Sequence, residues 1–252
     1  MSEGLPISSV AVERLADVWV YLSTTPLLGL TITLLVYQAA FVLYRRTGFH
    51  SLANPVGLSV VALGTLLWAT GTPYATYFQG AQFVHFLLGP ATVALAVPLM
   101  EQLPRIKRLW LPMLGALVVG TLTATVTAVA VGWAMGASKI TLASLAPKSV
   151  TAPVAMGIAE KIGGLPSLTA VLVVTTGILG AASGRWLFDL LRIQDPVVRG
   201  FALGTAAHGI GTARAFQMNE DSGAFAGLAM GLSALFSAVA LPLVAGWLLR
   251  WV

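Results

Sequence analysis

The sequence predicts an all-α membrane protein whose helices cross the bilayer several times. Of its 252 residues, 57% are hydrophobic and only 9% are charged, whereas soluble domains carry about 25% charged residues. Apolar runs near the roughly 20 residues that a bilayer helix needs recur along the chain. Arginines and lysines gather between these runs, as they do in cytoplasmic loops. We therefore expect a polytopic helix bundle of seven or eight spans.

The first half of the chain is expected to supply four spans. Residues 1–17 carry several charges and predict a polar, interfacial lead-in rather than a signal peptide. Spans then follow at 18–44, 55–70, 86–103 and 109–135. The third of these contains Gly89–Pro90 and Pro98, which predict a broken helix because proline interrupts helical hydrogen bonding.

The second half contains one segment that does not fit an ordinary span. Residues 140–162 are too polar and too rich in proline, with Pro-Lys-Ser-Val-Thr-Ala-Pro near the centre. Basic clusters at 105–108 and 185–199 are expected in the cytoplasm, so the spans at 109–135 and 165–184 must cross in opposite directions. The segment between them then enters and leaves on the outer side, as a re-entrant hairpin.

Two further spans, 200–218 and 224–249, bring the count to seven, and taking 140–162 as a full crossing gives eight. Both counts stay open. With seven, the basic residues and Arg250 are cytoplasmic, while the loops at 71–82 and 219–221 are outside. The N-terminus is then outside and the C-terminus cytoplasmic, in a multi-pass protein of the cell (inner) membrane.

The chain also repeats itself at an offset of 57 residues. Residues 88–97 align with 145–154 through a leucine, a proline and two valines, and Gly120 aligns with Gly177. Because the two spans that follow should be antiparallel, this predicts an inverted repeat with hairpins near 86–103 and 140–162. Such repeats hold transporter sites near the bilayer midplane. Chance similarity between alanine- and valine-rich segments is the alternative.

Lys148 is the most informative single residue, because a lysine inside an apolar stretch is costly unless it is paired or reaches water. Prolines on either side free backbone amides, and a helix N-terminus with nearby hydroxyls binds carboxylate or phosphate. The alternative is a lysine that extends to the interface. The predicted anion-binding residues here are Pro147, Lys148, Ser149 and Thr151, with Pro90 and Thr92 from the aligned hairpin.

A second constellation lies in the 200–218 segment. Thr205, His208 and Thr212 share one helical face, and glycines beside His208 would let the helix break. The histidine titrates near physiological pH and could carry a coupling proton; Arg214 could hold a carboxylate. The alternatives are a hydrogen-bonded structural histidine and an arginine at the helix end. Glu101 is a second candidate proton carrier, or else a surface partner of Arg105.

Several classes of function are excluded. There is no cysteine, and the three histidines have no metal-ligand spacing. No nucleotide-binding loop or protease motif stands in a credible context, so we expect no enzyme, no metal and no cofactor. The basic residues form no patch suited to nucleic acid.

Three blocks of sequence carry a family resemblance: 88–102; Pro-Lys-Ser-Val-Thr-Ala-Pro-Val-Ala-Met at 147–156; and 199–214, which includes Gly-Thr-Ala-Ala-His. They resemble the LrgB/CidB membrane protein family, which also supplies a domain of the plastid glycolate/glycerate transporter. The resemblance spans nearly all of 18–252, expected to form one LrgB-like transport domain. Met100 and Ala207 stand where the family usually has tyrosine and serine.

The resemblance implies two functions. One is secondary transport of small monocarboxylates (glycolate, glycerate, pyruvate or similar), with proton coupling through His208. The other is an antiholin-like effect on murein hydrolase export and lysis. Besides the organic anion and the bilayer, it implies an LrgA-type membrane subunit as partner, and self-association into a homo-oligomer stays open.

Overall fold

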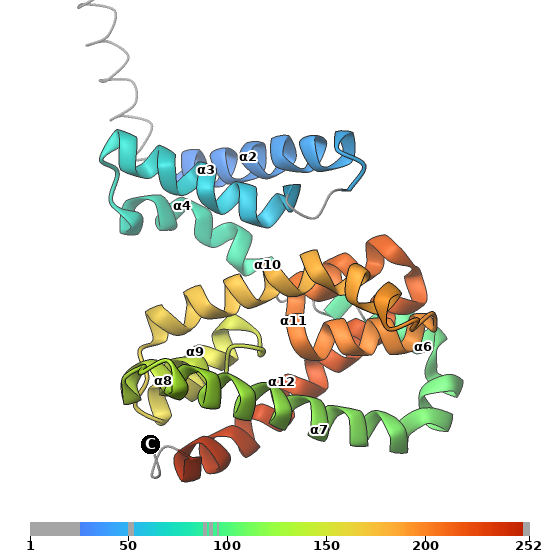
Figure 1. Cartoon of the computed structure of the whole chain (residues 1–252). Helices are drawn as coiled ribbons and strands as arrows, with labels where there is room; N and C mark the ends of the chain where they lie inside the picture. Colours follow the sequence, from blue (N-terminus) through green and yellow to red (C-terminus); the bar gives the residue numbers. More distant parts are fainter. Residues whose placement is uncertain (1–25, 50–52, 88–89, 91–92, 95, 249–252) are drawn as a thin grey trace, which may run out of the picture. The chain divides into compact units, whose positions relative to one another are not determined.

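The computed structural model describes residues 26–49, 53–87, 90, 93–94 and 96–248, and all regular secondary structure within them is helical. Figure 1 shows the helices in chain order. The chain divides into two compact units, residues 1–91 and 92–252, which we call the N-terminal and C-terminal units. The expected lead-in at 1–17 lies outside the described residues.

The N-terminal unit consists of α2 (Pro26–Arg46), α3 (Pro55–Thr70) and α4 (Tyr74–Phe86). Asn54 caps α3 by accepting hydrogen bonds from the first amides of the helix. Helices α2 and α4 approach so closely that a Cβ on Gly29 would lie 2.6 Å from the Tyr77 carbonyl oxygen. The Thr33 and Tyr77 hydroxyls, 2.7 Å apart, join the same pair of helices.

Three long helices form the frame of the C-terminal unit: α7 (Leu103–Ala134), α10 (Pro166–Leu190) and α12 (Glu220–Leu248). A short helix, α6 (Ala96–Glu101), precedes them. Leu117 of α7 shares an apolar cluster with Ala229 of α12, and further along Val129 shares one with Ala245. Helices α7 and α12 therefore run in the same direction, and α10 runs the opposite way (Figure 1).

A broken hairpin occupies the segment for which a re-entrant loop is expected. It consists of α8 (Lys139–Leu145) and α9 (Ala152–Lys161), joined by the turn 146–151. Gly132 near the end of α7 packs against Leu142. The backbone N–H of Leu165, just before α10, donates to the Ser144 hydroxyl at 2.8 Å. The chain thus enters and leaves this hairpin at the same end of the unit.

Helix α11 (Pro196–Met218) is a second hairpin rather than a crossing helix. Its backbone leaves helical geometry at Ala207 (φ −126°, ψ 15°) and His208 (φ 43°, ψ −132°). A Cβ on Gly211 would meet the Leu203 carbonyl oxygen and Ala207. A straight helix would hold residues 203 and 211 about 12 Å apart, so the second half of α11 folds back along the first.

This reversal corrects the expected topology. Arg105 forms an ion pair with Asp221 at 3.2 Å, and Gln102 donates to the same carboxylate at 2.8 Å. The Ser222 hydroxyl also donates to the Pro196 carbonyl at 2.8 Å. The expectation that 105–108 and 219–221 lie on opposite sides is therefore wrong, because α11 doubles back instead of crossing. It follows that α12 ends at the opposite end of the unit from Arg105.

Four helices of the described residues are long and apolar enough to cross a membrane: α2 from Leu27, α7, α10 and most of α12. The apolar helix α3 is shorter. The seven-span count takes 200–218 as a crossing. The described residues do not confirm this count, because α11 is not among the four candidate spans. The inverted repeat stays a prediction, since part of 88–97 lies outside the described residues.

Candidate functional site

The tips of the two hairpins converge on one residue of α10. The Val173 carbonyl accepts a hydrogen bond of 2.9 Å from His208 Nε2, at the break of α11. The Val173 side chain belongs to the same apolar cluster as Val150, in the turn between α8 and α9. The two hairpins enter from opposite ends of the C-terminal unit, and their tips, with the helices around them, form what we call the central site.

The first tip carries the predicted anion-binding residues. Lys148 is half-buried, and its Nζ donates to the Ser149 hydroxyl over 3.4 Å. Ser149 and Pro147 are buried. Thr151 occupies the N-cap of α9 without a side-chain capping bond. An ammonium group, two hydroxyls and the positive end of a helix thus lie together, a combination suited to an anion.

The second tip positions His208. Because a carbonyl only accepts hydrogen bonds, the bond to Val173 requires the proton on Nε2. Gly177 of α10 makes room for the ring, since a Cβ there would lie 2.7 Å from His208 Cε1. Thr205 donates to Phe201 and Thr212 to His208, each at 2.9 Å to a backbone carbonyl. The single helical face expected for these residues is wrong, because the break separates the two threonines.

The remaining predicted residues lie elsewhere. Arg214 is buried and donates to the Gln217 side chain at 3.2 Å. It is six residues beyond His208, about 9 Å along the returning helix. Glu101 is exposed at the end of α6, and Arg105 pairs with Asp221. Pro90 is exposed in the N-terminal unit, and Thr92 is outside the described residues.

Three buried hydroxyl groups were missed by sequence reasoning. They belong to Thr121 of α7 and to Ser233 and Ser237 of α12, and none has a hydrogen-bond partner among the described residues. The two serines are four residues apart in an otherwise apolar span, so they share one helical face. That spacing is the signal that could have identified them.

The charges of the described residues favour an anion at the central site. Their acidic side chains lie at exposed or half-exposed positions at the ends of helices (Glu101, Glu160, Asp189, Asp195, Glu220 and Asp221). None of these carboxylates is buried beside Lys148. The described part of the chain also holds no cluster of three histidine or acidic residues that could bind a metal ion.

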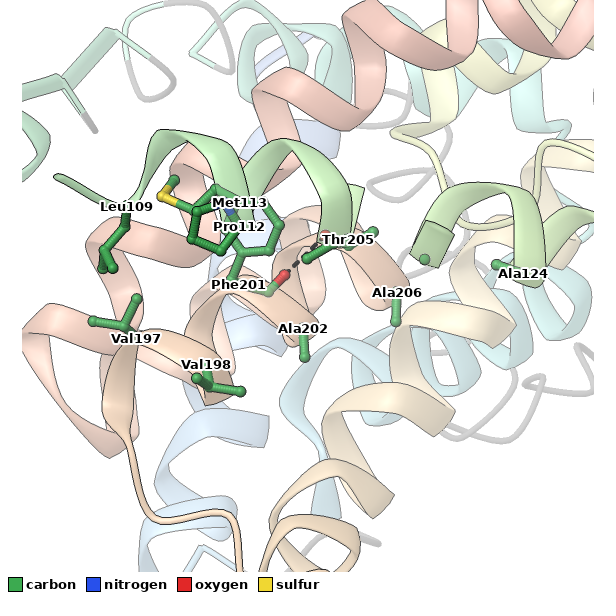
Figure 2. Close-up of a pocket in the computed structure, with 12 residues that line it drawn as sticks. Leu109, Pro112, Met113, Ala124, Val197, Val198, Phe201, Ala202, Thr205 and Ala206 are labelled. Atoms are coloured by element: carbon green, nitrogen blue, oxygen red, sulfur yellow. Dashed lines mark hydrogen bonds between the residues drawn. The ribbon is translucent and has the colours of Figure 1, made fainter. Parts of the chain in front are cut away.

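An apolar groove of about 470 Å³ runs between α7 and the first half of α11. Figure 2 shows Leu109, Pro112 and Met113 on one wall, with Val197, Phe201 and Ala202 on the other. The groove ends at Thr205 and Ala206, directly before the break in α11. It therefore reaches from the end of the unit that holds Arg105 toward the central site.

Comparison with known proteins identifies the family. The model of the LrgB-like family matches residues 33–247. The antiholin-like protein LrgB of Bacillus mycoides is 30% identical over 220 residues, which cover 87% of this chain and 95% of that protein. The proteins of the same name from Bacillus cereus and Bacillus anthracis match to the same extent. No solved structure matches. This chain is a membrane protein that belongs to the LrgB-like family.

Proposed function

We propose that this protein is a secondary transporter of small organic anions, with monocarboxylates such as glycolate, glycerate or pyruvate as substrates. The observation that carries the proposal is the convergence of two hairpin tips from opposite ends of the C-terminal unit, with Lys148 at one and His208 at the other. Broken helices that meet in the middle of a membrane protein are the usual architecture of secondary transporters.

In this proposal the first tip binds the carboxylate. The Lys148 ammonium supplies the charge, while Ser149 and the first turn of α9 supply hydrogen-bond donors. His208 at the second tip is the candidate for proton coupling, since its ring already donates to a backbone carbonyl. Movement of either hairpin would open the site toward its own end, which gives alternating access.

The orientation follows from charge. One end of the C-terminal unit carries Lys107, Arg108, Arg185, Arg192 and Arg199 beside the Arg105–Asp221 pair. By the positive-inside rule this end faces the cytoplasm. Since α12 ends at the opposite end, the proposed orientation has the C-terminus outside.

Uptake into proteoliposomes tests the function. Labelled glycolate, glycerate and pyruvate are offered to the wild type, Lys148→Ala and Lys161→Ala, with and without a pH gradient. Lys161 is an exposed lysine at the far end of α9 and serves as the matched control. Loss of a charged hydrogen-bond partner typically costs about 1.5–3 kcal/mol, so Lys148→Ala should weaken uptake by roughly ten- to a hundred-fold. Equal uptake by the two variants would refute the assignment of the site.

The second candidate function is antiholin-like regulation of murein hydrolase export and lysis, and the names of the relatives favour it. A regulator without a bound substrate has no need of the Lys148 ammonium. Under this reading Lys148→Ala retains its effect on lysis of a host cell, and the purified protein shows no saturable uptake. Repeating the uptake assay with an LrgA-type subunit would separate a missing partner from an absent transport function.

A further inference from the structure

We infer that Thr121, Ser233 and Ser237 form an uncharged part of the central site, which recognises a hydroxyl or keto oxygen of the transported anion. The inference rests on the proposed transport function and deepens it. The first tip binds the carboxylate, and these three hydroxyls select anions that carry an additional oxygen.

The three hydroxyls differ from most other serine and threonine hydroxyls of the described residues. Helical serines and threonines usually donate to the carbonyl four residues earlier. Thr33, Thr127 and Ser183 do so here, at 2.6 to 2.7 Å. Thr121 Oγ1, Ser233 Oγ and Ser237 Oγ are fully enclosed and make no such bond, nor any other within the described residues. These three hydroxyls are therefore buried polar groups whose hydrogen bonds are not made within the described residues.

The packing of α12 places its two serines between the hairpin tips. Met230 lies on the same face, and its sulfur is 3.9 Å from the Thr212 hydroxyl of the second tip. One turn beyond Ser237, Leu241 belongs to the cluster of Val150 at the first tip. Residues 230, 233, 237 and 241 follow each other at helical spacing. The serines are thus at the level where the tips converge.

Thr121 reaches the same level from α7. Helices α7 and α12 are parallel, because Leu117 shares one apolar cluster with Ala229 and Val129 shares another with Ala245. This register sets Thr121 opposite the region of Ser233 and Ser237. One turn further, Thr125 donates to the Ala146 carbonyl at the end of α8, at 3.3 Å. Helix α7 therefore lies against the start of the first tip at Thr125, one turn beyond Thr121.

The chemistry of the three groups specifies the ligand. A buried hydroxyl without a partner is less favourable than an alanine, so these positions call for a partner that the described residues do not provide. The middle parts of α7 and α12, residues 109–134 and 222–245, contain no charged residue. A hydroxyl can both donate and accept, and three of them without charge fit an uncharged oxygen better than a carboxylate.

The test compares two acids that differ by one hydroxyl group. Binding of glycolate and of acetate is measured by calorimetry on the full-length protein in nanodiscs. Variants are Thr121→Val, Ser233→Ala, Ser237→Ala and the matched control Ser183→Ala, an exposed serine that bonds to its own helix. The wild type should prefer glycolate by about ten-fold or more, because a site built to bond a hydroxyl rejects the analogue that lacks it. Each site variant should lose most of this preference through weaker glycolate binding, with acetate binding unchanged.

Three results are decisive. If all three site variants keep the wild-type ratio, the inference is refuted, while acetate binding that depends on Lys148 would still support the transport function. If the wild type binds neither acid, with and without an LrgA-type subunit, both proposals fall. The melting temperatures of the serine variants should equal or exceed that of the wild type, since each change removes an unpaired buried hydroxyl. A clear drop would mean that the hydroxyls bond within the protein, and would also refute the inference.

Discussion

The backbone of His208 provides the sharpest test of the fold. Its φ of 43° and ψ of −132° lie where glycine is readily accommodated and other residues are strained, at a cost of about 1–3 kcal/mol. His208→Ala and His208→Gly both remove the imidazole and its bond to Val173, but only the glycine variant relieves this strain. We therefore expect His208→Gly to be more stable than His208→Ala by about 1–2 kcal/mol.

The sign of this difference makes the test strong. In the interior of an ordinary helix, glycine is less stable than alanine by about 1 kcal/mol. Ala238, an exposed position within α12, is the control, and Ala238→Gly should lower stability by that amount. Thermal unfolding in detergent measures both, with about 2–4 °C expected per kcal/mol for a protein of this size. If glycine at position 208 is no more stable than alanine, then α11 does not break at His208, and the convergence of the hairpin tips is refuted.

Two further predictions concern the α11 hairpin. Gly204→Ala places a Cβ against the α12 backbone and should destabilise the protein by about 1–3 kcal/mol or more, whereas Gly115→Ala, with open space around it, should be neutral or stabilising; equal melting temperatures for the two variants would contradict the packing. Because the chain lacks cysteine, single cysteines at Lys107, Asn219 and Lys161 can be labelled with an impermeant thiol reagent. Lys107→Cys and Asn219→Cys should react from one side of the membrane and Lys161→Cys from the other. If Asn219→Cys instead reacts from the same side as Lys161→Cys, α11 crosses the membrane and the hairpin is refuted.

The hairpin formed by α8 and α9 could be predicted from the sequence because prolines mark the break in its helix. Pro147 and Pro153 flank Lys148, and proline interrupts a helix wherever it falls in the interior. The basic clusters at 105–108 and 185–199 further predicted that both ends of the segment 140–162 lie on the same side of the membrane. Lys148 and Ser149 could therefore be placed at a hairpin tip from the sequence alone, without knowledge of any contact.

The α11 hairpin has a weaker local signal: the glycines beside His208 permit a break, but no proline follows Pro196 in this helix. Its length of 23 residues matches that of a crossing helix, although it is less apolar than the four candidate spans, and its reversal depends on tertiary contacts. Gly200 and Gly204 let the first half lie directly on the α12 backbone, and Gly180 makes room for Ala207. The mistaken crossing then reversed the expected side of residues 219–221.

The spacing of Ser233 and Ser237 could have placed both on one helical face, but it could not have shown that their hydroxyls are unpaired. A serine in an apolar span usually bonds to its own backbone, so the sequence does not distinguish Ser183 from Ser237. Only the geometry shows that one is paired and exposed and the other enclosed without a partner.

The contact between α11 and α12 also bears on how the protein is made. A re-entrant hairpin has backbone groups at its tip that lipid cannot satisfy, so it is stable only against neighbouring helices. The Gly200 and Gly204 surface of α11 rests on Ser222 and Ala226 of α12, which is synthesised after it. The α11 hairpin therefore reaches its final position only once the following helix has entered the bilayer, and the central site is completed as one of the last steps of biogenesis.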